Sequence, residues 1–202
     1  MVRRTKEEAE KTREALLDAA EFVFLEKGVA NASLEDIARS AGVTRGAVYW
    51  HFENKLALFD AMHERVKLPM DELFERAMHD GDSFTALKEV CITVMRHLAE
   101  DARAKRVFTI LLLKCEETCP AQSNVERQQQ KRDKVIQRFE KIFTAAHQDG
   151  KLGPDTSPQT AAIALHATIC GVLNDYVRNP EVLDIATLGP QLIEIFFRGI
   201  SA

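Results

Sequence analysis

Apolar residues recur at helical spacing along most of the 202-residue chain. In the segment from about residue 7 to 27, Leu17 and Phe24 fall on one face. Gly28 follows where a helix commonly ends. A longer apolar series repeats at steps of three and four between residues 84 and 98. Because the chain holds only nine glycines and six prolines, the pattern predicts an all-α fold rather than an architecture of strands and turns.

The first part of the chain carries the signals of two short helices joined by a tight turn. Ser33 can cap the first helix, and Asp36 completes a capping box in which aspartate replaces the usual glutamate. Gly42 ends that helix, and Thr44 can cap a second helix that runs to about Phe52. Two short helices at this separation indicate a helix-turn-helix.

The expected architecture is a helix-turn-helix domain over residues 1–55, followed by a helical ligand-binding and dimerisation domain over residues 56–202. Asn54 can cap a long helix at this boundary. Pro69 interrupts that helix in one of two ways. Either the helix kinks there, or it ends near Leu68 and a new helix begins with proline in its first position.

Composition and charge exclude several classes of protein. The charged N-terminus leads into no apolar segment, so it is not a signal peptide, and no apolar stretch approaches the ~20 residues of a membrane span. We therefore expect a cytoplasmic protein. No group of acid, base or nucleophile residues indicates an enzyme, and we expect no cofactor and no metal. Net charge is −4, and residues 1–55 hold nine Lys/Arg against ten Asp/Glu, so DNA binding must be argued from individual side chains.

The second short helix has an unusual surface. Val48 and Phe52 can pack inward, which leaves three aromatic side chains, Tyr49, Trp50 and His51, on the remaining faces. Exposed aromatics at this density form an apolar patch on a solvent-facing helix, but they suit a helix that enters the major groove of DNA. Trp50 has a second interpretation, which is packing within the small domain.

Other side chains near this helix suit DNA as well. Arg45 can reach a guanine edge and Gly46 permits close approach. Thr44 and Lys55 lie at helix N-termini that favour phosphate. An N-terminal arm with Arg3 and Arg4 adds cations. The residues predicted to contact DNA are Arg3, Arg4, Ser33, Thr44, Arg45, Gly46, Tyr49, Trp50, His51 and Lys55.

The segment Ala161–Leu173 is apolar on every side except for His166 and Thr168. In a domain of this size one face can meet the core, while the other needs a partner. The last helix offers a second apolar surface. We therefore predict a homodimer formed through the helices at about 158–178 and 186–200, as a four-helix bundle.

The span from Thr12 to about Leu58 resembles the DNA-binding head of the TetR family of repressors. The resemblance includes the sequence Val-Thr-Arg-Gly-Ala-Val-Tyr-Trp-His-Phe over residues 43–52. This form is similar to the AcrR/TtgR-like branch, which controls multidrug efflux pumps. The resemblance implies a homodimeric repressor that a small apolar or amphipathic ligand releases from a palindromic operator. It also implies that the stretch Lys105–Glu116 lines the ligand pocket.

Residues on the C-terminal helices are candidates for that pocket, although ordinary core packing explains each of them as well. The candidates are Met62, Val66, Cys91, Met95, Phe108, Leu112, His166, Cys170 and Asn174. Two alternatives keep the same fold. Cys115 and Cys119, four residues apart, can act as a redox pair, and a DNA-binding architectural protein would have no inducer at all.

Overall fold

A computed structural model describes residues 6–79, 81–115 and 122–202. The described secondary-structure elements are all helices, apart from one isolated β-bridge, which confirms the predicted all-α class. The helices are α1 (Lys6–Lys27), α2 (Leu34–Ser40), α3 (Arg45–His51), α4 (Lys55–Met78), α5 (Ser83–Glu100), α6 (Ala102–Thr109), the π-helical turn η1 (Ile110–Lys114), α7 (Gln122–Gln148), α8 (Pro158–Arg178) and α9 (Ile185–Ile200).

The chain divides into two compact units. The head unit comprises the described residues of Met1–Leu68 and Arg106–Thr118, and the body unit comprises those of Pro69–Lys105 and Cys119–Ala202. The head unit therefore contains not only the three N-terminal helices but also the end of α6 and η1, which the chain reaches only after leaving the head.

Local capping begins both helices of the helix-turn-helix as predicted. The Ser33 hydroxyl accepts the Asp36 N–H at 3.1 Å, and the Asp36 carboxylate accepts the Ser33 N–H at 3.1 Å. This reciprocal pair is the expected capping box. Thr44 caps α3 by accepting the Ala47 N–H at 3.3 Å. Gly42 lies in the left-handed region, with φ +67°, where a glycine ends a helix without strain.

Helix α4 begins at a cap formed by Asn54 and continues past Pro69. Asn54 caps it, because its side-chain oxygen accepts the Ala57 N–H at 2.9 Å. The helix then runs without interruption from Lys55 to Met78. The interpretation that one helix ends near Leu68 and a second begins at Pro69 is therefore wrong. A helix tolerates an internal proline when packing along the rest of its length offsets the lost backbone hydrogen bond.

The head unit is held together by a small apolar core and by buried charge. Phe24 of α1 and Phe59 of α4 pack edge to face with ring centroids 5.9 Å apart, and both rings are buried. Within this core lies one carboxylate, Glu21 of α1, which is 0% exposed. It accepts hydrogen bonds from Arg106 of α6 at 2.8 and 3.2 Å and lies 3.5 Å from Arg65 of α4. A buried carboxylate requires partners of this kind.

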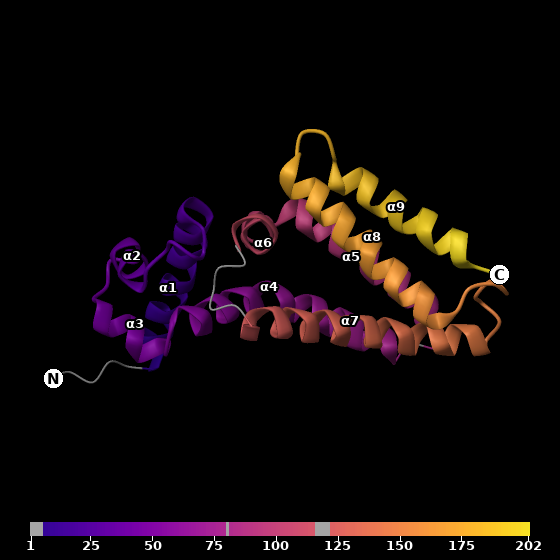
Figure 1. Cartoon of the computed structure of the whole chain (residues 1–202), viewed down its shortest axis with the longest axis horizontal. Coiled ribbons are helices and arrows are strands. Elements are labelled where there is room, and N and C mark those ends of the chain that lie inside the picture. The colour runs from indigo at the N-terminus through magenta and orange to yellow at the C-terminus, as the bar shows by residue number, and fades with distance from the viewer. Residues whose placement is uncertain (1–5, 80, 116–121) are drawn as a thin grey trace. The chain divides into compact units, whose positions relative to one another are not determined.

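In the body unit, α9 packs on α5 and α8, and α7 packs on α8 and α5 (Figure 1). A cluster of rings joins three of these helices: Phe84 of α5 lies 6.1 Å from Phe143 of α7 and 5.2 Å from Phe197 of α9.

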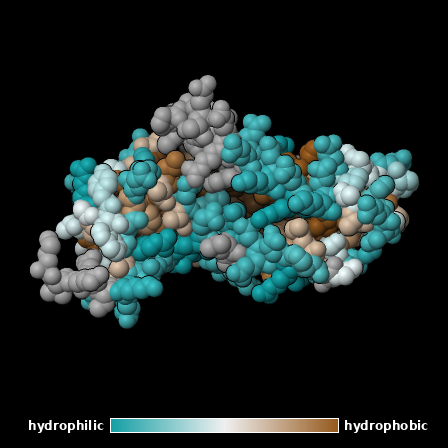
Figure 2. All heavy atoms as spheres, turned by 90° about the horizontal axis from the view of Figure 1, so that it is seen from below, coloured by the Kyte–Doolittle hydropathy of each residue, from teal (hydrophilic) through white to brown (hydrophobic). Residues whose placement is uncertain are grey.

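On the face shown in Figure 2, hydrophilic residues cover most of the surface and apolar residues are visible mainly as strips between them. None of the described helices combines the length and the apolarity needed to cross a bilayer.

Helices α5 and α9 approach each other closely at Gly189. A Cβ atom added there would lie 2.9 Å from the Met95 Cβ and 3.2 Å from the Ile185 Cγ1. Alanine at this position normally gains up to about 1 kcal/mol in helix propensity, but overpacking a core costs about 1–3 kcal/mol. Because the Met95 Cβ cannot swing away, we expect Gly189→Ala to lower the free energy of unfolding by about 1–2 kcal/mol.

Urea unfolding followed by circular dichroism measures this change. Gly199→Ala is the matched control, since no atom lies within 4 Å of the added Cβ, and it should be neutral or slightly stabilising. A stabilised Gly189→Ala protein would show that α5 and α9 are packed less tightly than described.

Candidate nucleic-acid interface

Helix α3 has one buried and one exposed side. Val48 is 0% exposed and Phe52, directly after the helix, is 4% exposed. On the other side Tyr49 is 49% exposed and Trp50 is 72% exposed. The alternative in which Trp50 packs within the domain is therefore wrong. Since α3 carries a cation and two large exposed aromatics on one side, its surface is complementary to an aromatic and anionic partner such as DNA.

Arg45 and Tyr49 form a single unit on this surface. The Arg45 Nη2 donates to the Tyr49 hydroxyl at 3.3 Å, and the guanidinium lies over the ring, 5.5 Å from its centroid. The hydrogen bond to Tyr49 raises the pKa of Arg45. The tyrosine thus orients the guanidinium along α3 and leaves other N–H groups to donate to a base edge.

The ring of Trp50 lies edge to face with that of His51, with centroids 4.5 Å apart. This contact orients an indole that has little other cover. Gly46 is exposed next to Arg45 on α3. Because glycine has no side chain, the backbone of α3 is accessible at this position. Close approach of a recognition helix to DNA needs such an opening.

Two residues predicted to contact DNA, Ser33 and Thr44, also cap helices. The Ser33 hydroxyl donates to the Asp36 carboxylate at 2.7 Å, and Thr44 accepts from the backbone of α3. Both side chains are exposed, and the Thr44 hydroxyl keeps its hydrogen for another acceptor. Arg3 and Arg4 lie outside the described residues.

Lys55 has a structural role that sequence reasoning missed. Its Nζ donates to the carbonyl oxygens of Ala30 at 2.9 Å and Ala32 at 2.8 Å. The ammonium therefore ties the loop between α1 and α2 to the start of α4. Of its three N–H groups one remains for a phosphate.

We predict that Lys55→Ala has two separable effects. Loss of two charge-assisted hydrogen bonds should lower the free energy of unfolding by about 1.5–3 kcal/mol. Loss of one phosphate contact per chain should weaken binding to all DNA sequences and reduce the slope of log K against log salt by about 0.9 for each chain bound to the DNA. Urea unfolding and DNA titrations at several salt concentrations measure the two. A destabilised variant with an unchanged salt slope would leave Lys55 only its structural role.

The candidate ligand residues of the head unit differ in how far they are buried. Met62 and Val66 of α4 are buried, at 0% and 4% exposure. Phe108 of α6 is half-buried, and Leu112 of η1 is 37% exposed. The first two thus serve the head core, whereas the second two retain surface for a ligand.

The candidate ligand residues of the body unit include a polar pair on α8, formed by His166 and Cys170. The Cys170 Sγ lies 3.6 Å from the His166 Nε2, whereas Asn174 accepts from the Arg178 Nε at 2.9 Å. Burial, with a smaller contribution from Arg132, lowers the pKa of His166, so this imidazole is neutral at pH 7.

The two α5 candidates, Cys91 and Met95, are buried, at 1% and 0% exposure. Burial raises the pKa of Cys91 to about 12, so its thiol stays protonated at neutral pH. Together with the neutral His166, these groups place no formal charge at the candidate ligand residues of the body unit.

Two contacts of the head unit involve the end of α6 and the segment after it, and they were not foreseen. The Val29 N–H donates to the Lys114 carbonyl at 3.0 Å, and Arg106 binds the buried Glu21. The Arg106 guanidinium also lies 4.8 Å from the ring centroid of Phe22. These partners are about 85 positions apart, and no local pattern links them. The family resemblance pointed to the stretch Lys105–Glu116 as pocket lining, but no sequence pattern assigned any of its residues to the head unit.

Known proteins resemble the whole chain. The solved structure of NalD, the secondary repressor of the MexAB-OprM multidrug efflux pump in Pseudomonas aeruginosa, is 42% identical with a TM-score of 0.87, over 97% of this chain and 98% of that one. The SmeT–triclosan complex is 36% identical with a TM-score of 0.85, over 95% and 92%. The transcriptional repressor BepR of Brucella suis biovar 1 (strain 1330) is 35% identical, over 100% of this chain and 97% of BepR.

Family models agree with these similarities. Residues 16–62 match the model of bacterial regulatory proteins of the tetR family. Residues 82–201 match the C-terminal region of the MAATS-type transcriptional repressors. The first match contains both helices of the helix-turn-helix, and the second covers α5 to α9. The chain therefore belongs to the TetR family and is a helix-turn-helix transcriptional repressor, not an enzyme.

Proposed function

We propose that this repressor binds a palindromic operator as a homodimer and is released when a small apolar or amphipathic ligand binds its C-terminal domain. The regulated operon encodes a multidrug efflux pump. The observation that carries this proposal is the exposed surface of α3, in a chain similar over its whole length to repressors of such pumps.

In the DNA complex α3 lies in the major groove. Arg45 reads a guanine, while Tyr49 and Trp50 contact thymine methyl groups or the backbone. Thr44, His51 and the remaining N–H of Lys55 bind phosphates. The helix-turn-helix within residues 1–55 supplies these contacts, and two copies spaced by about 34–36 Å would read the two halves of the operator.

The homodimer forms through α8 and α9. Three large apolar side chains of these helices are exposed in the single chain: Ile163 at 42%, Leu188 at 39% and Ile195 at 56%. Ala167 and Gly171 are also exposed on α8, and small residues allow close approach of a second helix. Sedimentation velocity should therefore give twice the mass of the chain, whereas a monomer at micromolar concentration would contradict this interface.

We expect the part of the ligand that contacts the candidate residues of the body unit to be uncharged. Cys91 carries a protonated thiol and His166 a neutral imidazole at pH 7, so neither adds a formal charge. SmeT was solved with triclosan, a compound of this apolar kind. Such a ligand releases DNA only if it binds better to a conformation in which the two reading helices no longer match the operator.

Footprinting on the promoter beside the chain's own gene tests the proposal, with and without triclosan. We expect one protected palindrome, and protection that decreases as triclosan is added. No protected site would contradict the operator assignment. Triclosan that binds the protein, as measured by calorimetry, while leaving operator affinity unchanged would contradict the release mechanism.

The relatives NalD and SmeT are repressors of multidrug efflux pumps, which favours a small-molecule signal over redox sensing. Cys119 lies outside the described residues.

A further inference from the structure

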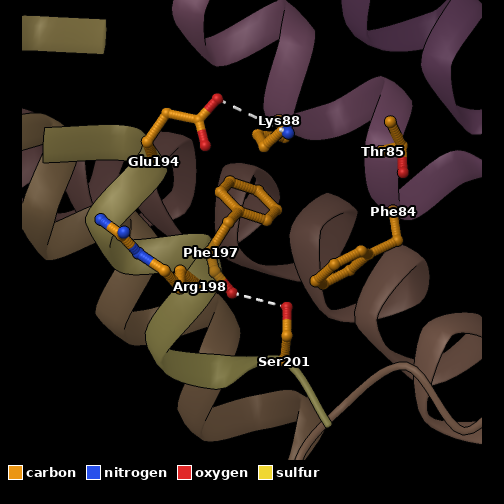
Figure 3. A pocket seen from close by; sticks show the side chains of 7 residues that line it. All are labelled: Phe84, Thr85, Lys88, Glu194, Phe197, Arg198 and Ser201. Carbon is orange, nitrogen blue, oxygen red and sulfur yellow. Dashed lines mark hydrogen bonds and ion pairs between the residues drawn. The ribbon is translucent and has the colours of Figure 1, made fainter. Parts of the chain in front are cut away.

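A pocket between α5 and α9 lies apart from every residue discussed so far as a ligand or DNA contact. Its volume is about 330 Å³, and Phe84, Thr85, Lys88, Glu194, Phe197, Arg198 and Ser201 line it. Figure 3 shows the rings of Phe84 and Phe197 near its centre, with the charged side chains of Lys88 and Glu194 to one side of the Phe197 ring. The pocket therefore joins an aromatic wall to a charged rim.

The pocket is rigidly built. Phe197 is 2% exposed and packs against Phe84 with ring centroids 5.2 Å apart. Ser201 donates to the Phe197 carbonyl at 2.8 Å. An isolated antiparallel bridge joins Ser201 to Leu152 and holds the end of α9 in place. Phe197 thus supports the ring of Phe84 from the inner side, and the half-buried Phe84 supplies the aromatic surface that a ligand can reach.

The rim has an unbalanced charge. The ammonium of Lys88 lies 3.6 Å from the carboxylate of Glu194, so the charges of these two side chains largely cancel. Arg198 is exposed, and within the part of the chain that the structure describes it forms no ion pair or hydrogen bond through its guanidinium. Its five N–H groups are available to an acceptor.

A second pocket of about 370 Å³ lies beside the first along α5 and α9 and shares Glu194 and Arg198 with it. Its lining also includes Ile195, a residue of the proposed homodimer contact. This second pocket adds one more cation, Arg96, and the apolar side chain of Ile92. Three cations and one carboxylate therefore line the joined groove of a chain whose net charge is −4. A local excess of positive charge on an acidic protein attracts anions selectively.

We propose that this groove binds an amphipathic organic anion, with its ring or chain against the half-buried ring of Phe84 and its carboxylate or sulfonate on Arg198. The volume is in the range of small-molecule sites, which combine apolar walls with a few polar groups. The arginine selects the anion, because a planar guanidinium pairs with two oxygens at once. This site does not rest on the proposed regulatory function, since it lies within the body unit of one chain and its occupancy is measured without DNA.

Two fluorescent probes that differ by one charged group test the site. 8-Anilinonaphthalene-1-sulfonate carries a sulfonate, and N-phenyl-1-naphthylamine is the same ring system without it. We expect Arg198→Gln to weaken sulfonate binding at one site per chain by about tenfold, as for loss of a charged hydrogen bond. Binding of the neutral probe should change by less than twofold. Lys141→Gln, which removes an exposed cation of α7 outside the groove, is the matched control and should change neither.

A second variant tests the apolar wall. Phe84→Leu keeps the pocket filled but removes the ring, so it should weaken whatever binding either probe has in this groove. Calorimetry gives the affinity and the number of sites per chain, and thermal unfolding shows that each variant is folded. The proposal is overturned if the wild-type chain does not bind the sulfonate, if Arg198→Gln and Lys141→Gln have equal effects, or if Arg198→Gln weakens both probes alike.

Discussion

Replacing Glu21 with alanine is expected to destabilise the head unit by about 3 kcal/mol or more, the largest loss that we predict for a single change. The carboxylate is 0% exposed, and its two oxygens face Arg106 at 2.8 Å and Arg65 at 3.5 Å. Removing one member of a buried ion cluster leaves the others desolvated and partly unpaired, which costs about 3–5 kcal/mol. The lower end applies, because Arg106 is 26% exposed and can recover some hydration.

Glu14→Ala is the matched control. Glu14 lies 3.2 Å from the same Arg65, but its side chain is 44% exposed, so its removal should cost less than about 1 kcal/mol. Urea unfolding followed by circular dichroism compares the two variants with the unchanged chain. Equal losses for the two variants would show that the Glu21 cluster is hydrated rather than buried.

A double variant separates the charge from the packing. If Glu21→Met and Arg106→Met are combined, the buried charge is replaced on both sides by apolar groups of similar length. The pair should then be more stable than Glu21→Ala alone, because no unpaired carboxylate or guanidinium is left in that contact. A double variant that is as unstable as the sum of its single changes would contradict this coupling.

Arg45→Ala is expected to weaken operator binding by about 1–3 kcal/mol for each half-site that the arginine reads, which is about 5- to 150-fold. The guanidinium is exposed at the start of α3 and is oriented by Tyr49. Its loss removes a base contact rather than only a charge, so discrimination between operator and scrambled DNA should decrease as well.

Fluorescence anisotropy with the footprinted operator and with a scrambled duplex measures both quantities at one salt concentration. Arg76→Ala removes the same side chain from an exposed position of α4 in the body unit and should leave both affinities unchanged. Normal operator binding by Arg45→Ala would show that α3 does not read bases through this residue.

The helix-turn-helix was predictable because its signals are local. Ser33, Thr44 and Asn54 each cap a helix through a backbone N–H three residues away. Side chain and partner are thus fixed by the same short segment, whatever the rest of the chain does. The same holds for Ser157, which caps α8 ahead of Pro158.

Local signals were insufficient for Trp50 and Pro69. Both the exposed and the packed position of an indole fit the helical period of α3, and only the burial of Val48 and Phe52 leaves Trp50 outside. An internal proline is compatible with a break or with a continuous helix. The structure keeps α4 continuous, which is a property of the whole helix rather than of the residues around the proline.

The sequence by itself therefore determined the helical class and the capped pair of helices, because these depend on neighbours within one or two turns. Only the tertiary structure decided that Arg106 neutralises Glu21, that Lys55 holds the carbonyls of Ala30 and Ala32, and that the segment after α6 belongs to the head unit. Such contacts join residues 23 to 85 positions apart. Long-range pairings of this kind are selected by the packing of the whole unit, which no local pattern encodes.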